Sequence, residues 1–207
     1  MTPSLNAVYE ELIRLAASST LSASAIELRK QFTKRTGAIP DEHPSASARV
    51  AASWEDALVA GGLASKLLDA FDDTAERAMA QVISRAQRGV FELDVSTDPV
   101  MVRDLWSGGE FLLLKRDDVA RSAPSFADAE SSVFVGRLVG SDEGCAVLPG
   151  MIWLPSESLP LLMELRAAAL SKGLSLDGFA DALLKMDAQV QTLARVKVRY
   201  AFRVEAL

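Results

Sequence analysis

The chain has 207 residues, a length that fits one domain, and its 22 basic and 28 acidic residues give a net charge of −6. It contains one cysteine, Cys145, and one histidine, His43. A structural zinc site needs about four cysteine or histidine ligands, and a disulfide within the chain needs two cysteines. We therefore expect no metal centre, no cofactor and no internal disulfide.

Neither the N-terminus nor any apolar stretch predicts an association with membranes. The first residues lack the basic region of a signal peptide. The longest apolar stretch, 144–155, is interrupted by Pro149 and Gly150 and is shorter than the roughly 20 residues of a spanning helix. We expect a soluble, cytoplasmic protein without membrane insertion.

Residues 1–88 show the apolar spacing of helices, and we interpret them as a helical subdomain. Ser24 with Glu27 and Asp73 with Glu76 resemble capping boxes, which predict helices beginning near residues 24 and 73. Apolar residues in the second and third helices are expected to form core faces: Ile26, Leu28 and Phe32, then Val50, Trp54 and Leu58.

Residues 89–156 change to the short runs and turn signals of strands. We expect strands at 90–95, 101–106, 110–115, 133–139 and 145–148, with 151–154 extending the last one after a bend at Pro149-Gly150. Hairpin connections between them predict a small antiparallel sheet or barrel of about five strands.

Residues 157–207 are interpreted as C-terminal helices followed by a terminal basic strand. Apolar residues alternate with others from 195 to 204, which places Arg195, Lys197, Arg199 and Arg203 on one face of a strand. The alternative is that the preceding helix continues to about Arg199. The fold class is therefore α+β, with the three segments forming one compact unit.

Several residue types that often act in catalysis or ligand binding have structural interpretations in this sequence, and we identify no catalytic residue. His43 lies in a proline-bounded turn, and Cys145 lies in an apolar strand, where a thiol behaves as a small hydrophobic group. The paired glycines and paired carboxylates occur at expected turns. We expect core packing for three tryptophans: Trp54, Trp106 and Trp153.

The terminal basic face is the candidate partner-binding surface: Arg195, Lys197, Arg199 and Arg203. Two alternatives stay open. The four cations can be a solvated edge that prevents aggregation, or they can pair with residues 89–160, which carry 12 acidic and 5 basic residues.

Several segments together resemble a family of uncharacterised bacterial proteins with a helical N-terminal half, a small β segment and a helical C-terminal part. They are Trp54-Glu55-Asp56-Ala57-Leu58, 104–110, 148–151, 195–197, 200–203 and 205–207. The middle segment is also similar to the small barrel of proteins that carry a SecA-type zinc motif, although that motif is absent here. The resemblance implies an architecture and no activity.

For function we expect a non-enzymatic cytosolic interaction or scaffold protein that binds a protein partner or itself. The large apolar fraction, 49%, leaves room for an interface. The alternative is an enzyme or small-molecule-binding domain whose carboxylate-lined pocket forms only in the folded chain. Nucleic-acid binding is disfavoured, because the middle segment carries a net charge of −7 that repels phosphates.

Overall fold

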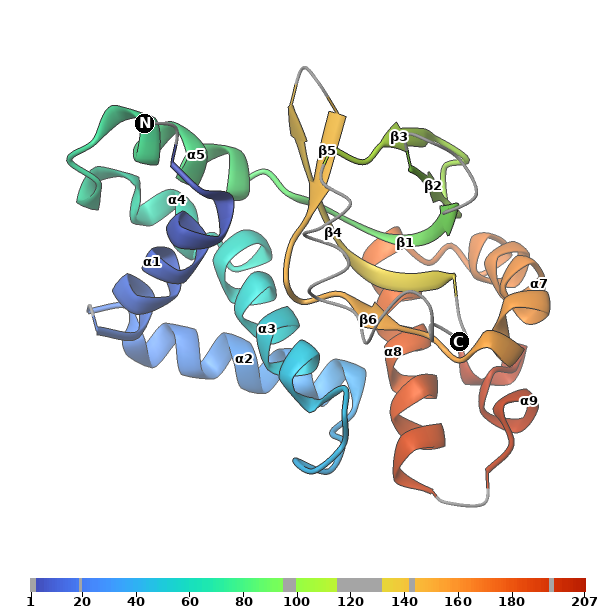
Figure 1. Ribbon diagram of the computed structural model, residues 1–207. Helices are drawn as coiled ribbons and strands as arrows, with labels where there is room; N and C mark the ends of the chain where they lie inside the picture. Colours follow the sequence, from blue (N-terminus) through green and yellow to red (C-terminus); the bar gives the residue numbers. More distant parts are fainter. Residues whose placement is uncertain (1–2, 19, 95–99, 115–131, 142–143, 194–195) are drawn as a thin grey trace.

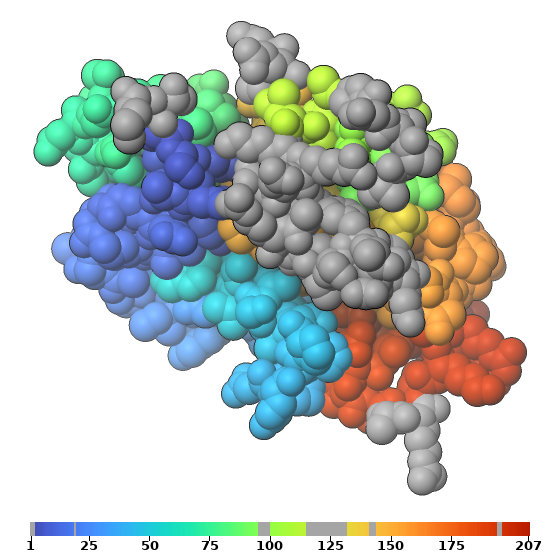
Figure 2. Space-filling view, in the orientation of Figure 1, coloured from blue at the N-terminus to red at the C-terminus, as the bar shows by residue number. Residues whose placement is uncertain are grey.

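A computed structural model describes residues 3–18, 20–94, 100–114, 132–141, 144–193 and 196–207. Figure 1 shows the predicted α+β architecture, in which helices flank a central curled antiparallel sheet. Figure 1 shows the N-terminal helices beside one end of this sheet and the C-terminal helices beside the other, and Figure 2 shows the same orientation. Both groups pack on the same face of the sheet, because Phe32 and Ala52 share a core cluster with Val90, Val135 and the C-terminal helices. The predicted α+β fold class is confirmed.

The N-terminal helices bury an apolar cluster of their own. They are α1 (Leu5–Ser18), α2 (Ser22–Thr36), α3 (Ala46–Glu55), η1 (Asp56–Ala60), α4 (Leu63–Lys66), η2 (Leu68–Ala70) and α5 (Thr74–Ile83). The predicted cap of α5 is confirmed, because the Asp73 carboxylate accepts from the backbone N–H groups of Ala75 and Glu76. The predicted cap at Ser24 is wrong, since α2 begins at Ser22.

The third helix changes its winding near its end. After α3, residues Asp56–Ala60 form a π-helical turn, in which the Gly61 N–H bonds the Asp56 carbonyl. The buried face of the third helix runs through Arg49, Ala52, Ser53 and Asp56, so Val50 lies beside that face. Leu58 is fully buried, whereas Val50 is 50% exposed. The prediction that Val50 belongs to the core is therefore wrong.

The sheet has the strand order β3-β2-β1-β4-β5, with β6 also paired to β4. Its strands are β1 (Gln87–Asp94), β2 (Met101–Asp104), β3 (Glu110–Leu112), β4 (Val133–Ser141), β5 (Gly144–Val147) and β6 (Ile152–Trp153). Strands β5 and β6 pair with different ends of β4, because the chain bends at Pro149-Gly150. Phe91, Phe134 and Cys145 belong to the core cluster on one face of the sheet.

The C-terminal elements cover the other face of the sheet. They are η3 (Ser156–Ser158), α7 (Leu159–Ser171), α8 (Leu176–Thr192), α9 (Val198–Ala201) and η4 (Val204–Ala206). The predicted terminal strand is wrong, and so is its alternative, because α8 ends at Thr192 and α9 is a separate turn of helix. Ala201 and Phe202 are buried in the cluster around α8, so apolar packing onto a helix replaces pairing with a strand.

Helices long and apolar enough to cross a bilayer are not found in the part of the chain that the structure describes.

Candidate functional site: a groove between helices α2 and α3

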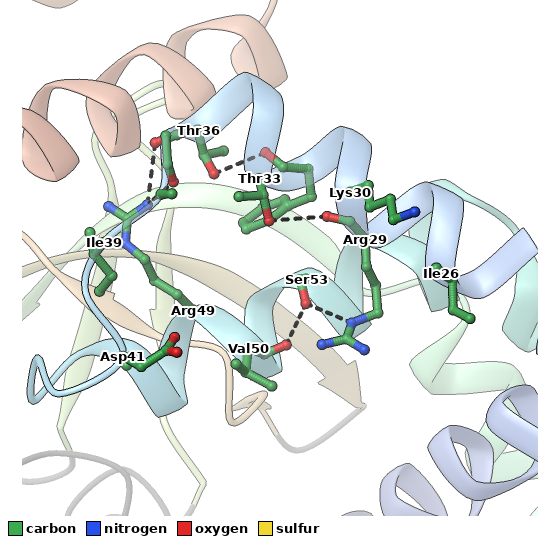
Figure 3. Close-up of a pocket in the computed structure, with 14 residues that line it drawn as sticks. Ile26, Arg29, Lys30, Thr33, Thr36, Ile39, Asp41, Arg49, Val50 and Ser53 are labelled. Atoms are coloured by element: carbon green, nitrogen blue, oxygen red, sulfur yellow. Dashed lines mark hydrogen bonds between the residues drawn. The ribbon is translucent and has the colours of Figure 1, made fainter.

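Helices α2 and α3 lie side by side and form the walls of an open groove with a volume of about 480 Å³ (Figure 3). Each wall repeats every three or four residues, which places its members on one helix face. The wall of α2 is Ile26, Arg29, Lys30 and Thr33, and the wall of α3 is Ala46, Arg49, Val50 and Ser53. Residues 37–39 and Asp41 close one end. This volume is within the usual range of ligand sites, about 300–1,000 Å³.

Arg29 is held in place on the α2 wall while its terminal nitrogens stay available. Its Nε donates to Ser53 Oγ across the groove at 3.0 Å (Figure 3). Its guanidinium carbon lies 4.3 Å from the ring centroid of Trp54. Burial lowers the pKa of Arg29, although an arginine stays charged at neutral pH. No described carboxylate forms an ion pair with Arg29. Among the described residues, no hydrogen-bond acceptor is found for its two terminal nitrogens.

Arg49 lines the groove on the α3 wall, but its guanidinium is engaged within the protein. It is only 7% exposed, and its two terminal nitrogens bond the Asp187 carboxylate and three backbone carbonyls. Its Nε–H is buried without a hydrogen-bond partner among the described residues. The Arg49 guanidinium is therefore held inside the protein and is not exposed to an occupant of the groove.

Apolar side chains complete the groove. Ile26 on α2 is 51% exposed and Val50 on α3 is 50% exposed. The prediction that Ile26 belongs to the core face of α2 is therefore wrong. Burying both side chains under a partner would add apolar stabilisation to a contact with Arg29.

Helix α2 makes this region positive in an acidic protein. It carries four basic residues and one acidic residue, whereas the whole chain has a net charge of −6. Sequence reasoning missed the groove because it arises from two helices packed together. The basic character of α2 was the signal that could have indicated it.

Beside the groove, a charge network that is buried except around Arg35 joins the N-terminal helices, the sheet and α8. The Asp56 carboxylate pairs with Arg35 at 2.7 Å and with Arg137 at 3.4 Å, and Asp181 pairs with Arg35 at 2.8 Å and with Arg88 at 2.7 Å. Arg49 and Asp187 form a further buried pair at 2.8 Å. These charges are matched, so they hold elements together and offer little to a ligand.

Glu55 lies at the end of α3 and is 1% exposed. Burial raises its pKa to about 7, while the Gly150 N–H that it accepts and the charges of Arg137 and Arg88 act in the opposite direction. The adjoining cavity has a volume of about 10 Å³, which is room for about one water molecule. Glu55 can therefore take up a proton near neutral pH, but the space beside it is too small for a substrate.

The predicted basic face is only partly described, since Arg195 lies outside the described residues. Lys197, Arg199 and Arg203 are exposed. Arg199 donates to the Tyr200 hydroxyl at 3.0 Å and its guanidinium carbon lies 4.9 Å from the centroid of that ring. Within the described ranges, no carboxylate pairs with these three cations.

His43 and Cys145 take the structural positions predicted for them. The Nδ1 of His43 accepts from the backbone N–H of Ser45 in the turn before α3. Cys145 is 3% exposed on β5, and burial raises the pKa of its thiol to about 11. A thiol in that state is a poor nucleophile at neutral pH.

The tryptophans divide between the core and the groove. Trp106 and Trp153 pack against core clusters, as predicted. Trp54 packs partly against the N-terminal cluster, and its ring also supports Arg29. Its role therefore extends beyond the core packing expected from the sequence.

Comparisons with protein-family models, curated proteins and solved structures yield no match. The resemblance to a family of uncharacterised bacterial proteins therefore stays a prediction, and the geometry of the chain itself must carry any proposal about function.

Proposed function

We propose that this is a non-enzymatic interaction protein that uses the α2–α3 groove to dock an acidic, amphipathic segment of a protein partner. The observation that carries the proposal is the guanidinium of Arg29, which pairs with no described carboxylate and is fixed by Ser53 and Trp54 at the wall of an open groove. Arginine recognises carboxylates through two parallel hydrogen bonds, and a pre-oriented side chain loses little freedom on binding.

The shape and composition of the groove favour a peptide helix as the occupant. The α2 wall from Ile26 to Thr33 spans two helical turns, or about 10 Å. Exposed Ile26 and Val50 provide apolar contacts on the two walls, as in the binding of amphipathic helices to hydrophobic grooves. A partner helix with an acidic residue one turn from apolar residues would satisfy Arg29 and cover both side chains.

The test is fluorescence anisotropy with the full chain and a labelled synthetic helix that carries leucines and glutamates at spacings of three and four residues. We expect saturable binding that weakens as salt rises, because carboxylate–guanidinium contacts are screened. Replacing the peptide's glutamates by glutamines should weaken binding at least tenfold. Arg29→Gln should weaken binding of the original peptide by a similar factor.

Lys34→Gln is the matched control, because Lys34 lies on α2 outside the groove. The control removes the same charge from the same helix and should change affinity less than twofold. If Lys34→Gln and Arg29→Gln weaken binding equally, the attraction is a general effect of the basic helix and the groove assignment is wrong. Absence of saturable binding to the glutamate peptide would also overturn it.

The terminal basic surface, Lys197, Arg199 and Arg203, is our proposal for a second contact. Exposed arginine beside exposed tyrosine is a common composition of interface hot spots, and Arg199 and Tyr200 have this arrangement. Reversing the charges of Lys197 and Arg203 should weaken a complex purified with the tagged protein. Unchanged affinity would remove this surface from the proposal.

We further propose the bacterial cytosol as the compartment. The chain has one cysteine and it is buried, so its fold does not depend on an oxidising environment. Tagged purification at low salt, followed by mass spectrometry and light scattering, would identify a stoichiometric partner or a homo-oligomer. A partner is assigned to the groove only if less of it co-purifies with the Arg29→Gln variant than with the original chain.

A further inference from the structure

A second cavity lies on the other side of the molecule from the groove, between the β1–β2 face and the start of α7. Its volume is about 390 Å³, within the range of small-molecule sites. Its apolar wall includes Leu105, Leu159 and Met163. Met163 is 58% exposed, so a ligand could cover it.

Two opposite charges line this cavity, and they form no ion pair with each other. Glu92 on β1 and Arg103 on β2 are directly opposite in the antiparallel register, where side chains share a face and lie close enough to interact. Neither forms an ion pair or hydrogen bond through its charged group with any described residue. On the far side of Arg103, Glu110 of β3 is the next residue in register, but it does not line the cavity.

The other two charged residues of the cavity are already engaged. Asp104 accepts from the Trp106 and Ser107 backbone N–H groups and from the Ser107 hydroxyl. Arg166 donates through Nε and a terminal nitrogen to the Trp106 carbonyl, at 3.0 and 2.7 Å. These bonds stiffen the rim, and they leave Glu92 and Arg103 as the groups available to a ligand.

We propose that this cavity binds a small zwitterionic molecule with an apolar side chain, such as a free amino acid. Arg103 would take its carboxylate and Glu92 its ammonium group, while Met163 and Leu159 would contact the side chain. A molecule with both charges matches the cavity better than a simple anion, because an anion would leave Glu92 unpaired beside it. The inference does not depend on the function proposed for the α2–α3 groove.

Isothermal titration of the full chain with L-leucine, L-methionine and L-phenylalanine tests the proposal. We expect at least one of the three to bind with one-to-one stoichiometry. For leucine, the matched probes are 4-methylpentanoate, which lacks the ammonium group, and 3-methylbutylamine, which lacks the carboxylate. Each of these two probes should bind at least tenfold more weakly than leucine. If methionine or phenylalanine is the ligand, its own decarboxylated and deaminated forms replace these probes.

The variants Glu92→Gln and Arg103→Gln should each weaken binding at least tenfold. Glu110→Gln is the matched control, since it changes the charge on the other side of Arg103 without touching the cavity, and it should change affinity less than twofold. Circular dichroism of each variant confirms that it is folded. No binding of any of the three amino acids at 10 mM, or equal binding of the acid without its ammonium group, would overturn the proposal.

Discussion

The groove and the charge network both include residues of α2 and α3, but they differ in whether their arginines pair with carboxylates. In the network, Arg35, Arg88 and Arg137 each pair with a carboxylate. In the groove, Arg29 pairs with none among the described residues, and one hydrogen bond and one ring contact hold it in place. The comparison separates arginines that fix the architecture from an arginine that is available to a partner.

The largest effect is expected from the Arg49–Asp187 pair, which joins α3 to α8. Asp187→Ala leaves the Arg49 guanidinium buried without its charge partner, a change that typically costs about 3–5 kcal/mol. Urea denaturation should show this loss in the free energy of unfolding.

Asp177→Ala is the control for this experiment. Asp177 is 3.6 Å from Arg88, but its side chain is 69% exposed, and exposed pairs contribute about 0–1 kcal/mol. If the two variants lose similar stability, the Arg49–Asp187 pair does not hold α3 against α8 as we argue.

The protonation of Glu55 should give the network a distinct pH dependence. Its pKa is raised from 4.5 to about 7, so between these values the folded chain retains a proton that the unfolded chain has lost. The stabilisation that this proton provides is complete below pH 4.5 and is lost as the pH rises toward 7. Above pH 7 this contribution no longer changes, and the total loss is about 3 kcal/mol.

Glu55→Gln resembles the protonated form and can still accept from the Gly150 N–H. The variant should therefore be more stable than the original chain at pH 8 and similar at pH 4.5. Thermal unfolding followed by circular dichroism at both values provides the measurement. A stability that is unchanged by the substitution at both pH values would show that Glu55 titrates normally.

Gly150 permits the close contact between the sheet and α3. A Cβ at this position would lie 2.5 Å from the Ala52 nitrogen and 2.7 Å from the Glu55 carboxyl carbon. Gly150→Ala should cost about 1–3 kcal/mol, as overpacking does. In β4, Gly140→Ala meets no atom within 4 Å and should change stability by less than about 0.5 kcal/mol. Equal effects in urea denaturation would contradict the argument.

The sequence predicted the sheet because its signals are local. Period-two apolar runs, the glycines near 108 and the bend at Pro149-Gly150 indicate strands and turns without knowledge of the rest of the fold. The Asp73 cap was predictable for the same reason. The terminal strand failed because the alternation in 195–204 does not show whether a neighbouring strand is available, and the chain packs on α8 instead.

The candidate sites could not be predicted from spacing alone. The groove needs the contact between α2 and α3, which buries Arg49 and Ser53 and leaves Val50 exposed on the wall. The second cavity needs the register that places Glu92 opposite Arg103. Whether a charge is paired decides our functional proposals, and that property appears only when distant segments are brought together.

The smallest effect on stability is expected where we propose the partner to bind. Arg29→Gln removes one hydrogen bond to Ser53 and one ring contact to Trp54, each contributing about 1 kcal/mol or less at a partly exposed site. The free energy of unfolding should fall by at most about 1–2 kcal/mol, well below the loss in Asp187→Ala. A loss as large as that of Asp187→Ala would make Arg29 part of the architecture and remove the distinction between the two regions.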